Sequence, residues 1–304
     1  MSLPPVHITR PGDIIGAPPY RAEGCLMHSV VLKGDRETQQ KYIDLVFNQP
    51  AKGEWTFEVV SDCLLLNAVY VDTMRSLDGV DGPKGVLAET DIGMWTPVVG
   101  WPKDWTQPCR TYWAPSFLYV DTPMAMTSGR EVYGYPKTSA KITRAAVARD
   151  DPTVAVDVLH MPAFGSAKRP KWGRLLEIGD IGPQADDETL AQKILAAWAQ
   201  LNVLAPLSLV PPSSISMPQL LLRQFRDPFT LGRASIQEAL VAEPVALALR
   251  GVGLLQDGAT LTLGASASHP VMETLGLAAT SPVSGFWIEQ DFELGAARSL
   301  WRNS

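Results

Sequence analysis

Short runs of β-branched and aromatic residues, separated by turn-forming residues, recur along most of this chain and restrict its fold more than any other feature. Such runs are typical of strands that pack at least one face against a core. The predicted strands cover residues 55–71 (as one or two strands), 95–99, 116–120, 124–127, 153–159, 219–225, 245–249, 259–264 and 285–292. Many short strands with few helices predict a β-rich α+β fold, in which a few helices flank an antiparallel sheet that is curved or closed into a barrel.

Two segments carry a helical pattern. Residues 35–47 offer Asp35 as an N-cap and continue with an apolar stripe. Residues 186–204 begin with three acidic residues, which suit the positive end of a helix dipole, and continue with one apolar face. The sequence contains no internal repeat and no low-complexity linker, so we predict a single domain over residues 1–304.

The composition limits the classes of partner. Of the 304 residues, 46% are hydrophobic and 19% are charged, which predicts a chain that buries a large core. The net charge of −6 lacks the basic surplus of nucleic-acid-binding domains, so no nucleic-acid partner is predicted. A membrane partner is not predicted either, because no run of about 18 apolar residues is present. The first residues lack the pattern of a secretory signal, which favours a cytoplasmic location.

The sequence offers no motif for a metal or an organic cofactor. Its three cysteines form no C-x-x-C pair, and its four histidines are scattered without the spacing of metal ligands. A Walker loop, a complete dinucleotide-binding glycine fingerprint and a G-x-S-x-G motif are all absent from the sequence. We therefore predict that the protein uses neither a metal nor a cofactor.

Residues 128–138, Ser-Gly-Arg-Glu-Val-Tyr-Gly-Tyr-Pro-Lys-Thr, carry the most chemical information. A lysine after a proline is usually solvated, but Lys137 follows Tyr133 and Tyr135, which predicts apolar surroundings that favour the neutral amine. A pKa lowered from about 10.4 to near 7 raises the neutral fraction from roughly one in two thousand to about half, and costs the fold about 4–5 kcal/mol. A neutral amine can attack a ketone and form an iminium, which accepts electrons.

Glu131 is the carboxylate nearest to Lys137 in the sequence and a candidate for moving protons. In a strand, alternation would place Glu131, Tyr133 and Lys137 on one face. A straight strand would nevertheless separate Glu131 from Lys137 by roughly 20 Å. The two residues can share a site only if the chain bends at Gly134 or Pro136. Otherwise Glu131 is a structural partner for a neighbouring arginine.

Residues 129–137 resemble the segment around the Schiff-base lysine of acetoacetate decarboxylases. The resemblance extends, in order, to residues 19–20 (the start of the first strand), 91–97 (Asp-Ile-Gly-Met-Trp-Thr-Pro, which looks like the segment with an active-site acid), 119–123 and, loosely, 219–301. It implies the acetoacetate decarboxylase-like fold, catalysis without a cofactor, a small oxo- or keto-acid substrate and a homo-oligomer.

The same resemblance implies roles for individual residues. Lys137 would form the Schiff base, and Asp91 would supply the acid. Glu89 lies close to that acid in the sequence and, with Cys25, is a candidate for substrate binding. Tyr133 occupies a position that lines the pocket in related aldolase-dehydratases, and Asp91, Glu131 or Tyr133 would move protons.

The chain departs from the family pattern at two positions. Thr138 stands where the decarboxylase has a second lysine, and Cys25 falls where the family has an N-terminal arginine. Burial is then the main means of lowering the pKa of Lys137. Trp95 and Trp113 are candidate pocket walls for substrate binding, with core packing or a subunit interface as the alternative.

Three functional hypotheses remain. In the first, the protein is a lyase in which Lys137 forms a Schiff base with an oxo acid and a carbon–carbon bond breaks, by decarboxylation of a β-keto acid or by retro-aldol cleavage. In the second, it is an aldolase-dehydratase, or it catalyses related carbon–carbon bond chemistry on a larger oxo substrate, which can be aromatic. In the third, it is a relative that binds ligands without catalysis.

Overall fold

The computed structural model describes residues 6–8, 16–105, 109–144, 153–182, 218–255, 258–277 and 282–303. Its strands are β1 (Tyr20–Lys33), β2 (Trp55–Val59), β3 (Cys63–Ser76), β4 (Leu87–Pro102), β5 (Arg110–Val120), β6 (Lys137–Arg144), β7 (Val154–His160), β8 (Lys171–Gly179), β9 (Gln219–Arg226), β10 (Ala234–Ala242), β11 (Pro244–Leu254), β12 (Thr260–Leu263), β13 (Ser284–Leu294) and β14 (Arg298–Asn303). Its helices are α1 (Arg36–Ile43), α2 (Gln49–Ala51), α3 (Pro123–Ser128) and α5 (Val271–Leu275), with π-helical turns η1 (Asp44–Asn48) and η3 (Gly129–Tyr133) and a 3-10 turn η2 (Gly82–Lys84).

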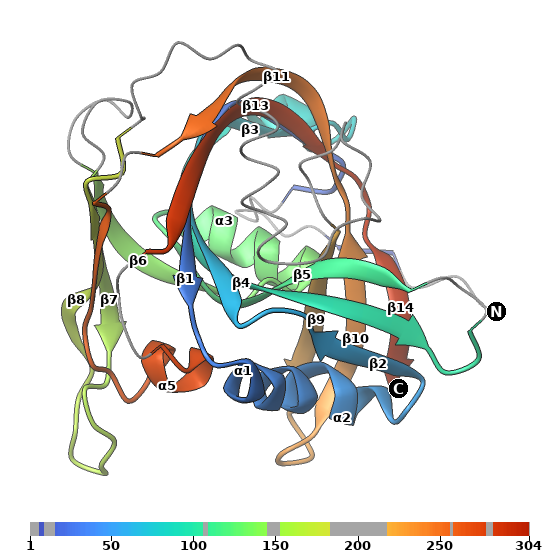
Figure 1. Cartoon of the computed structure of the whole chain (residues 1–304). Coiled ribbons are helices and arrows are strands. Elements are labelled where there is room, and N and C mark those ends of the chain that lie inside the picture. Colours follow the sequence, from blue (N-terminus) through green and yellow to red (C-terminus); the bar gives the residue numbers. More distant parts are fainter. Residues whose placement is uncertain are drawn as a thin grey trace.

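One large sheet dominates the described part of the chain. Its main path runs β11-β13-β1-β3-β4-β5-β6-β7-β8-β12, and β2, β9, β10 and β14 attach beside it. Figure 1 shows β11 and β13 arching over one end of the molecule, with α3 beneath the arch in this view and α1, α2 and α5 at the opposite end. The curved, unclosed sheet with few helices confirms the predicted fold class.

The sheet is mixed, because β5 pairs in parallel with both β6 and β9. Antiparallel neighbours can be joined by a tight turn, whereas parallel neighbours need a crossover connection. Between β5 and β6 that crossover consists of α3 and η3. The strand predicted over residues 124–127 is therefore wrong, since these residues lie in α3. Periodicity cannot separate a short apolar strand from a short helix.

The other local predictions can be compared directly with the structure. The helix predicted over 35–47 is confirmed, and the backbone N–H of Thr38 donates to Asp35 Oδ1 at 2.8 Å. Each remaining predicted strand overlaps a strand of the sheet. The helix predicted over 186–204 lies outside the described residues. No helix in the described ranges combines the length and the apolar character needed to cross a membrane.

The central strands bury both of their faces. In β3, Leu64 and Leu66 pack in one hydrophobic cluster while Leu65 packs in another, as expected when side chains alternate across a sheet. The cluster that contains Leu65 also holds Trp95 and Tyr135. This second face forms the cavity described next.

Candidate active site

Lys137 begins β6, directly after the turn formed by α3 and η3. Thr122 caps α3 by accepting a hydrogen bond from the backbone N–H of Met124. Gly134 ends the turn with φ at 81°, a conformation that favours glycine, and the chain then enters β6. A Cβ atom at Gly129 would lie 2.7 Å from Cδ of Lys137, so glycine at this position leaves room for the lysine stem.

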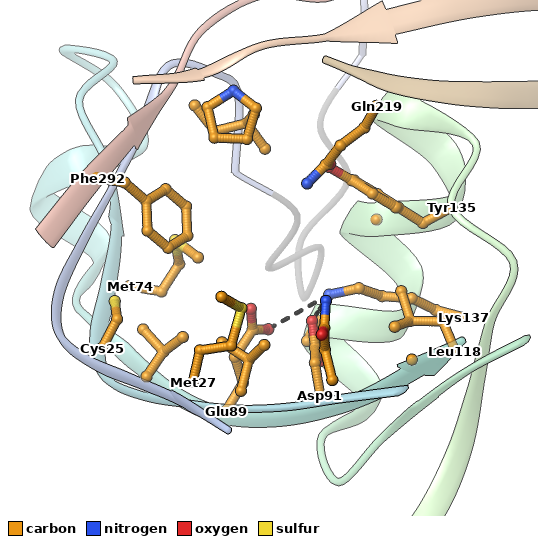
Figure 2. Close-up of a pocket in the computed structure, with 18 of the residues that line it drawn as sticks. Cys25, Met27, Met74, Glu89, Asp91, Leu118, Tyr135, Lys137, Gln219 and Phe292 are labelled. Atoms are coloured by element: carbon orange, nitrogen blue, oxygen red, sulfur yellow. Dashed lines mark hydrogen bonds and ion pairs between the residues drawn. The ribbon is translucent and has the colours of Figure 1, made fainter. Parts of the chain in front are cut away.

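The amine of Lys137 contacts two carboxylates. Its Nζ lies 2.9 Å from Oδ2 of Asp91 and 3.6 Å from Oε2 of Glu89, and Figure 2 shows the three side chains pointing toward one another. Glu89 and Asp91 are two residues apart in β4 and therefore share a face. Strand β5 links them to the lysine, because Asp91 pairs with Val120 and Lys137 pairs with Leu118. The side chains of Lys137 and Glu89 are only 8% and 6% exposed.

The charges in this cluster perturb one another. Burial, and then repulsion from Asp91, raise the pKa of Glu89 from 4.5 to about 7 although Lys137 opposes the shift. Burial also raises the pKa of Asp91. Burial alone lowers the pKa of Lys137, but the charges of Asp91 and Glu89 outweigh it, so the pKa is raised. The expectation that desolvation makes Lys137 neutral is corrected here, because it took no account of the two carboxylates.

A cavity of about 230 Å³ opens beside the lysine. Its walls are mostly apolar. They come from β1, β3, β4, β5, β6, β9, β11 and β13 and from α3 and η3. They include Met27, Leu65, Val69, Met74, Leu118, Phe286, Ile288 and Phe292. In Figure 2, Cys25, Met27, Met74 and Phe292 lie across the cavity from Lys137. Because apolar walls screen charges less than water does, electrostatic interactions between groups inside the cavity are strengthened.

Most of the sequence-predicted site residues line this cavity: Cys25, Glu89, Asp91, Trp95, Trp113, Tyr133 and Lys137. The hydroxyl of Tyr133 donates to the carbonyl oxygen of Gly295 at 2.8 Å, which leaves its ring as the cavity wall. Burial, and next the charge of Asp291, raise the pKa of the Cys25 thiol to about 12. Cys25 therefore forms a neutral, unreactive part of the wall.

Glu131 does not join the group. It lies in η3, its side chain is exposed, and it is not among the residues that line the cavity. The segment is helical at this point rather than extended, so the same-face placement expected from strand alternation is wrong. Glu89 and Asp91, on a distant strand, take the positions next to the amine.

Four tryptophans between residues 95 and 113 divide into two pairs. Trp95 and Trp113 line the cavity. Trp101 and Trp105 stack on each other instead, with ring centroids 6.2 Å apart and planes at 8°, and they do not line it. Trp95 packs edge-on against Tyr135, with centroids 6.5 Å apart. Only one of these two pairs therefore contributes to the cavity.

Sequence reasoning missed several polar wall residues, and two of them, Tyr135 and Gln219, are in contact with each other. The Tyr135 hydroxyl donates to Oε1 of Gln219, and the Lys137 amine lies 5.7 Å from the centroid of the Tyr135 ring. Gln219 reaches the cavity because β9 begins beside β5, where Gln219 pairs with Trp113. No local pattern marks a glutamine at the start of a strand as a site residue.

The chain matches no protein-family model and no curated protein, but its fold matches solved structures. Acetoacetate decarboxylase from Legionella pneumophila superposes with a TM-score of 0.66 at 15% identity, over 99% of this chain and 93% of that one. An acetoacetate decarboxylase-like enzyme from Sphingomonas wittichii RW1 gives 0.62 at 17% identity, over 97% and 98%.

A third neighbour is the enduracididine biosynthesis enzyme MppR, in complex with the condensation product of pyruvate and imidazole 4-carboxaldehyde. It gives a TM-score of 0.62 at 14% identity, over 98% of both chains. These likenesses show that the chain has the fold of the acetoacetate decarboxylase-like superfamily. At such low identity the chemistry has to be argued from the site itself.

Proposed function

We propose that the protein is a Schiff-base carbon–carbon lyase in which Lys137 condenses with a ketone or an oxo acid. The observation that carries this proposal is the buried amine of Lys137, held 2.9 Å from Asp91 and 3.6 Å from Glu89 at the wall of an apolar cavity. A lone buried ammonium needs one partner for charge balance. A second buried carboxylate is costly, and it is useful where protons must move during a reaction.

The three side chains can supply and accept every proton that Schiff-base formation requires. Lys137 transfers a proton to Asp91, its closest carboxylate, and the resulting amine adds to the carbonyl carbon. Glu89, whose pKa of about 7 allows it to carry a proton near neutral pH, protonates the carbinolamine oxygen, which leaves as water. The product is a positively charged iminium beside the protonated Asp91 and the ionised Glu89.

The iminium then acts as the electron sink. When a carbon–carbon bond to the α carbon breaks, its electron pair moves into the iminium and forms an enamine. The departing fragment is carbon dioxide, or an aldehyde when Glu89 accepts the proton of the β-hydroxyl group. Protonation of the enamine at the α carbon and attack by water release the ketone product and return the amine of Lys137. No other electron acceptor is needed for this balance.

Aldol-type chemistry is the second candidate. Among the described residues that line the cavity, Lys137 is the only cationic side chain, while Glu89 and Asp91 are both acidic. A β-keto acid would bring another carboxylate next to these two. An enamine that adds to an aldehyde, or an iminium that releases one, requires no such anion. The condensation product bound to MppR supports this route on the same fold.

Trapping the covalent intermediate tests the proposal. The protein is incubated with a panel of ketones and oxo acids and reduced with borohydride, and the modified peptide is located by mass spectrometry. We expect a substrate-derived mass on Lys137, absent from Lys137→Ala and kept in Lys141→Ala, a matched change on the same strand. An adduct at another lysine, or none with any compound, would contradict the proposal. Carbon dioxide release by wild-type protein separates decarboxylation from aldol chemistry.

A further inference from the structure

We infer that the cavity selects an uncharged carbonyl compound over an oxo acid, and that Gln219 holds a second, uncharged oxygen of that substrate. The inference rests on the proposed Schiff base for the role of Lys137, and it names the substrate class of the same site. Two observations support the inference: the charges of the side chains that line the cavity, and the orientation of the Gln219 amide.

The acidic side chains outnumber the cationic ones around the cavity. Of its described lining residues, only Glu89, Asp91 and Lys137 are charged, and the lysine lies between the two carboxylates. Schiff-base formation leaves this balance unchanged, since a charged iminium replaces a charged amine. Above the Glu89 pKa of about 7 the three side chains carry a net negative charge, so a substrate carboxylate would meet net repulsion and no free cation, in surroundings where repulsion is weakly screened.

The nearby arginines are committed elsewhere. Arg130 donates from Nη1 to the carbonyl oxygen of Lys137 at 3.1 Å, which directs its charge to the backbone. Three other arginines of the surrounding strands pair with carboxylates: Arg21 with Glu293, Arg75 with Glu23 and Arg250 with Asp291. None of these arginines lines the cavity. The described part of the chain thus provides no cationic anchor for a carboxylate at this site other than Lys137 itself.

Gln219 supplies a neutral donor instead. Its Oε1 already accepts the hydroxyl proton of Tyr135, so the amide group is fixed with its Nε2 as the end available for donation. No described residue accepts a hydrogen bond from that nitrogen. Figure 2 shows the Gln219 side chain directed into the cavity on the Tyr135 side, above Lys137. An amide N–H suits a ketone, ester or hydroxyl oxygen and adds no charge.

Three matched probes test the inference: 4-oxopentanoate, its methyl ester and 2-heptanone. The first is an anion, the second is neutral with a second oxygen, and the third is neutral without one. Binding is measured by calorimetry at pH 7.5, and covalent attachment is measured separately by borohydride reduction and peptide mapping. We expect the ester to bind at least about tenfold more tightly than the anion, because the three charged side chains carry a net negative charge at this pH.

The role of Gln219 is tested with Gln219→Leu. Loss of one hydrogen bond should raise the dissociation constant of the ester about five- to tenfold, while that of 2-heptanone should change less than twofold. Gln224→Leu, the same change at an exposed position of β9, should alter neither.

The possible failures are distinct. If 4-oxopentanoate binds as tightly as its ester, if Gln219→Leu weakens the ester and 2-heptanone equally, or if no probe binds, the inference is overturned. If the ester binds selectively but leaves no reducible adduct on Lys137, the substrate selection stands and the Schiff-base proposal is the one that falls.

Discussion

The Nζ atom of Lys137 lies 2.9 Å from Oδ2 of Asp91, although the two residues belong to strands separated by β5. Burial lowers the pKa of this lysine, and the charge of Asp91 makes the largest contribution to raising it. The pair therefore keeps the amine protonated until a substrate competes for it. The Asp91 carboxylate is also the nearest base to receive that proton. The same contact therefore keeps the amine protonated at rest and removes its proton when the amine reacts.

Replacing Asp91 tests this relationship. Asp91→Asn removes the charge that contributes most to raising the pKa of Lys137. The opposing effect of burial is then less compensated, and the pKa falls. The pH at which borohydride trapping of a ketone reaches half its maximal rate should move to lower pH, and the maximal rate should fall because the proton acceptor is lost. Glu131→Gln, at an exposed position of η3, should leave the profile unchanged. An unshifted profile in Asp91→Asn would show that this carboxylate does not control the amine.

The raised pKa of Glu89 should make the free energy of unfolding depend on pH. Its folded pKa of about 7 lies above its ordinary 4.5, so the folded state binds this proton more tightly than the unfolded chain does. The resulting stability is fully present below about pH 4.5 and is lost as the pH rises through about 7, a loss on the order of 1–3 kcal/mol. Asp91 contributes with the same sign, because its pKa is raised as well. The raised pKa of Lys137 affects stability only in the alkaline range.

Glu89→Gln isolates that contribution. Urea unfolding at pH 5 and pH 8 should show a smaller loss of unfolding free energy in the variant than in the wild type, by about 1–3 kcal/mol. Glu58→Gln, at an exposed glutamate of β2, is the matched control and should keep the wild-type loss. If Glu89→Gln loses as much stability between these pH values as the wild type, Glu89 does not hold the proton assigned to it.

The lysine could be found from the sequence because its signal is local. Aromatic residues precede Lys137 directly, and the resemblance of this segment to a known lysine segment lies within nine consecutive residues. The N-cap at Asp35 was predictable for the same reason. A short polar residue before an apolar stripe forms its hydrogen bond within a single turn, here to Thr38.

The environment of the lysine could not be predicted in the same way. Glu131 is near Lys137 in the sequence but is exposed, because η3 turns its side chain away from the cavity. Glu89 and Asp91 reach the amine through the pairing of β4 with β5 and of β5 with β6, and the second pairing is parallel. Such register is decided by the whole sheet. The direction of the lysine pKa shift depended on these same contacts, so it could not be read from the local apolar pattern.

Space around the lysine stem gives a third prediction. A methyl group at Gly129 would lie 2.7 Å from Cδ of Lys137, and the side chain of Lys137, which is the more flexible of the two, would have to move. Gly129→Ala should fold, since alanine favours a helical turn, but its rate of borohydride-trapped adduct formation should drop by about tenfold or more, as expected when a reacting group is misplaced by about 1 Å. Gly79→Ala, in a turn where an added Cβ meets nothing, should react as the wild type does. Normal trapping by Gly129→Ala would show that the position of the stem is not restricted.

The turn that delivers the lysine to β6 should depend strictly on Gly134. This residue has φ at 81°, and an added Cβ would lie 2.5 Å from the backbone nitrogen of Arg223, which cannot move as a side-chain tip can. Gly134→Ala should therefore lower the unfolding free energy by about 2–4 kcal/mol, through both the backbone conformation and the clash. Gly232→Ala separates the two causes, because Gly232 has φ at 74° and open space around its Cβ position. Urea unfolding of this control should show a loss of about 1 kcal/mol. Equal losses in the two variants would mean that the contact between η3 and β9 does not restrict the turn, and that conformation alone demands glycine there.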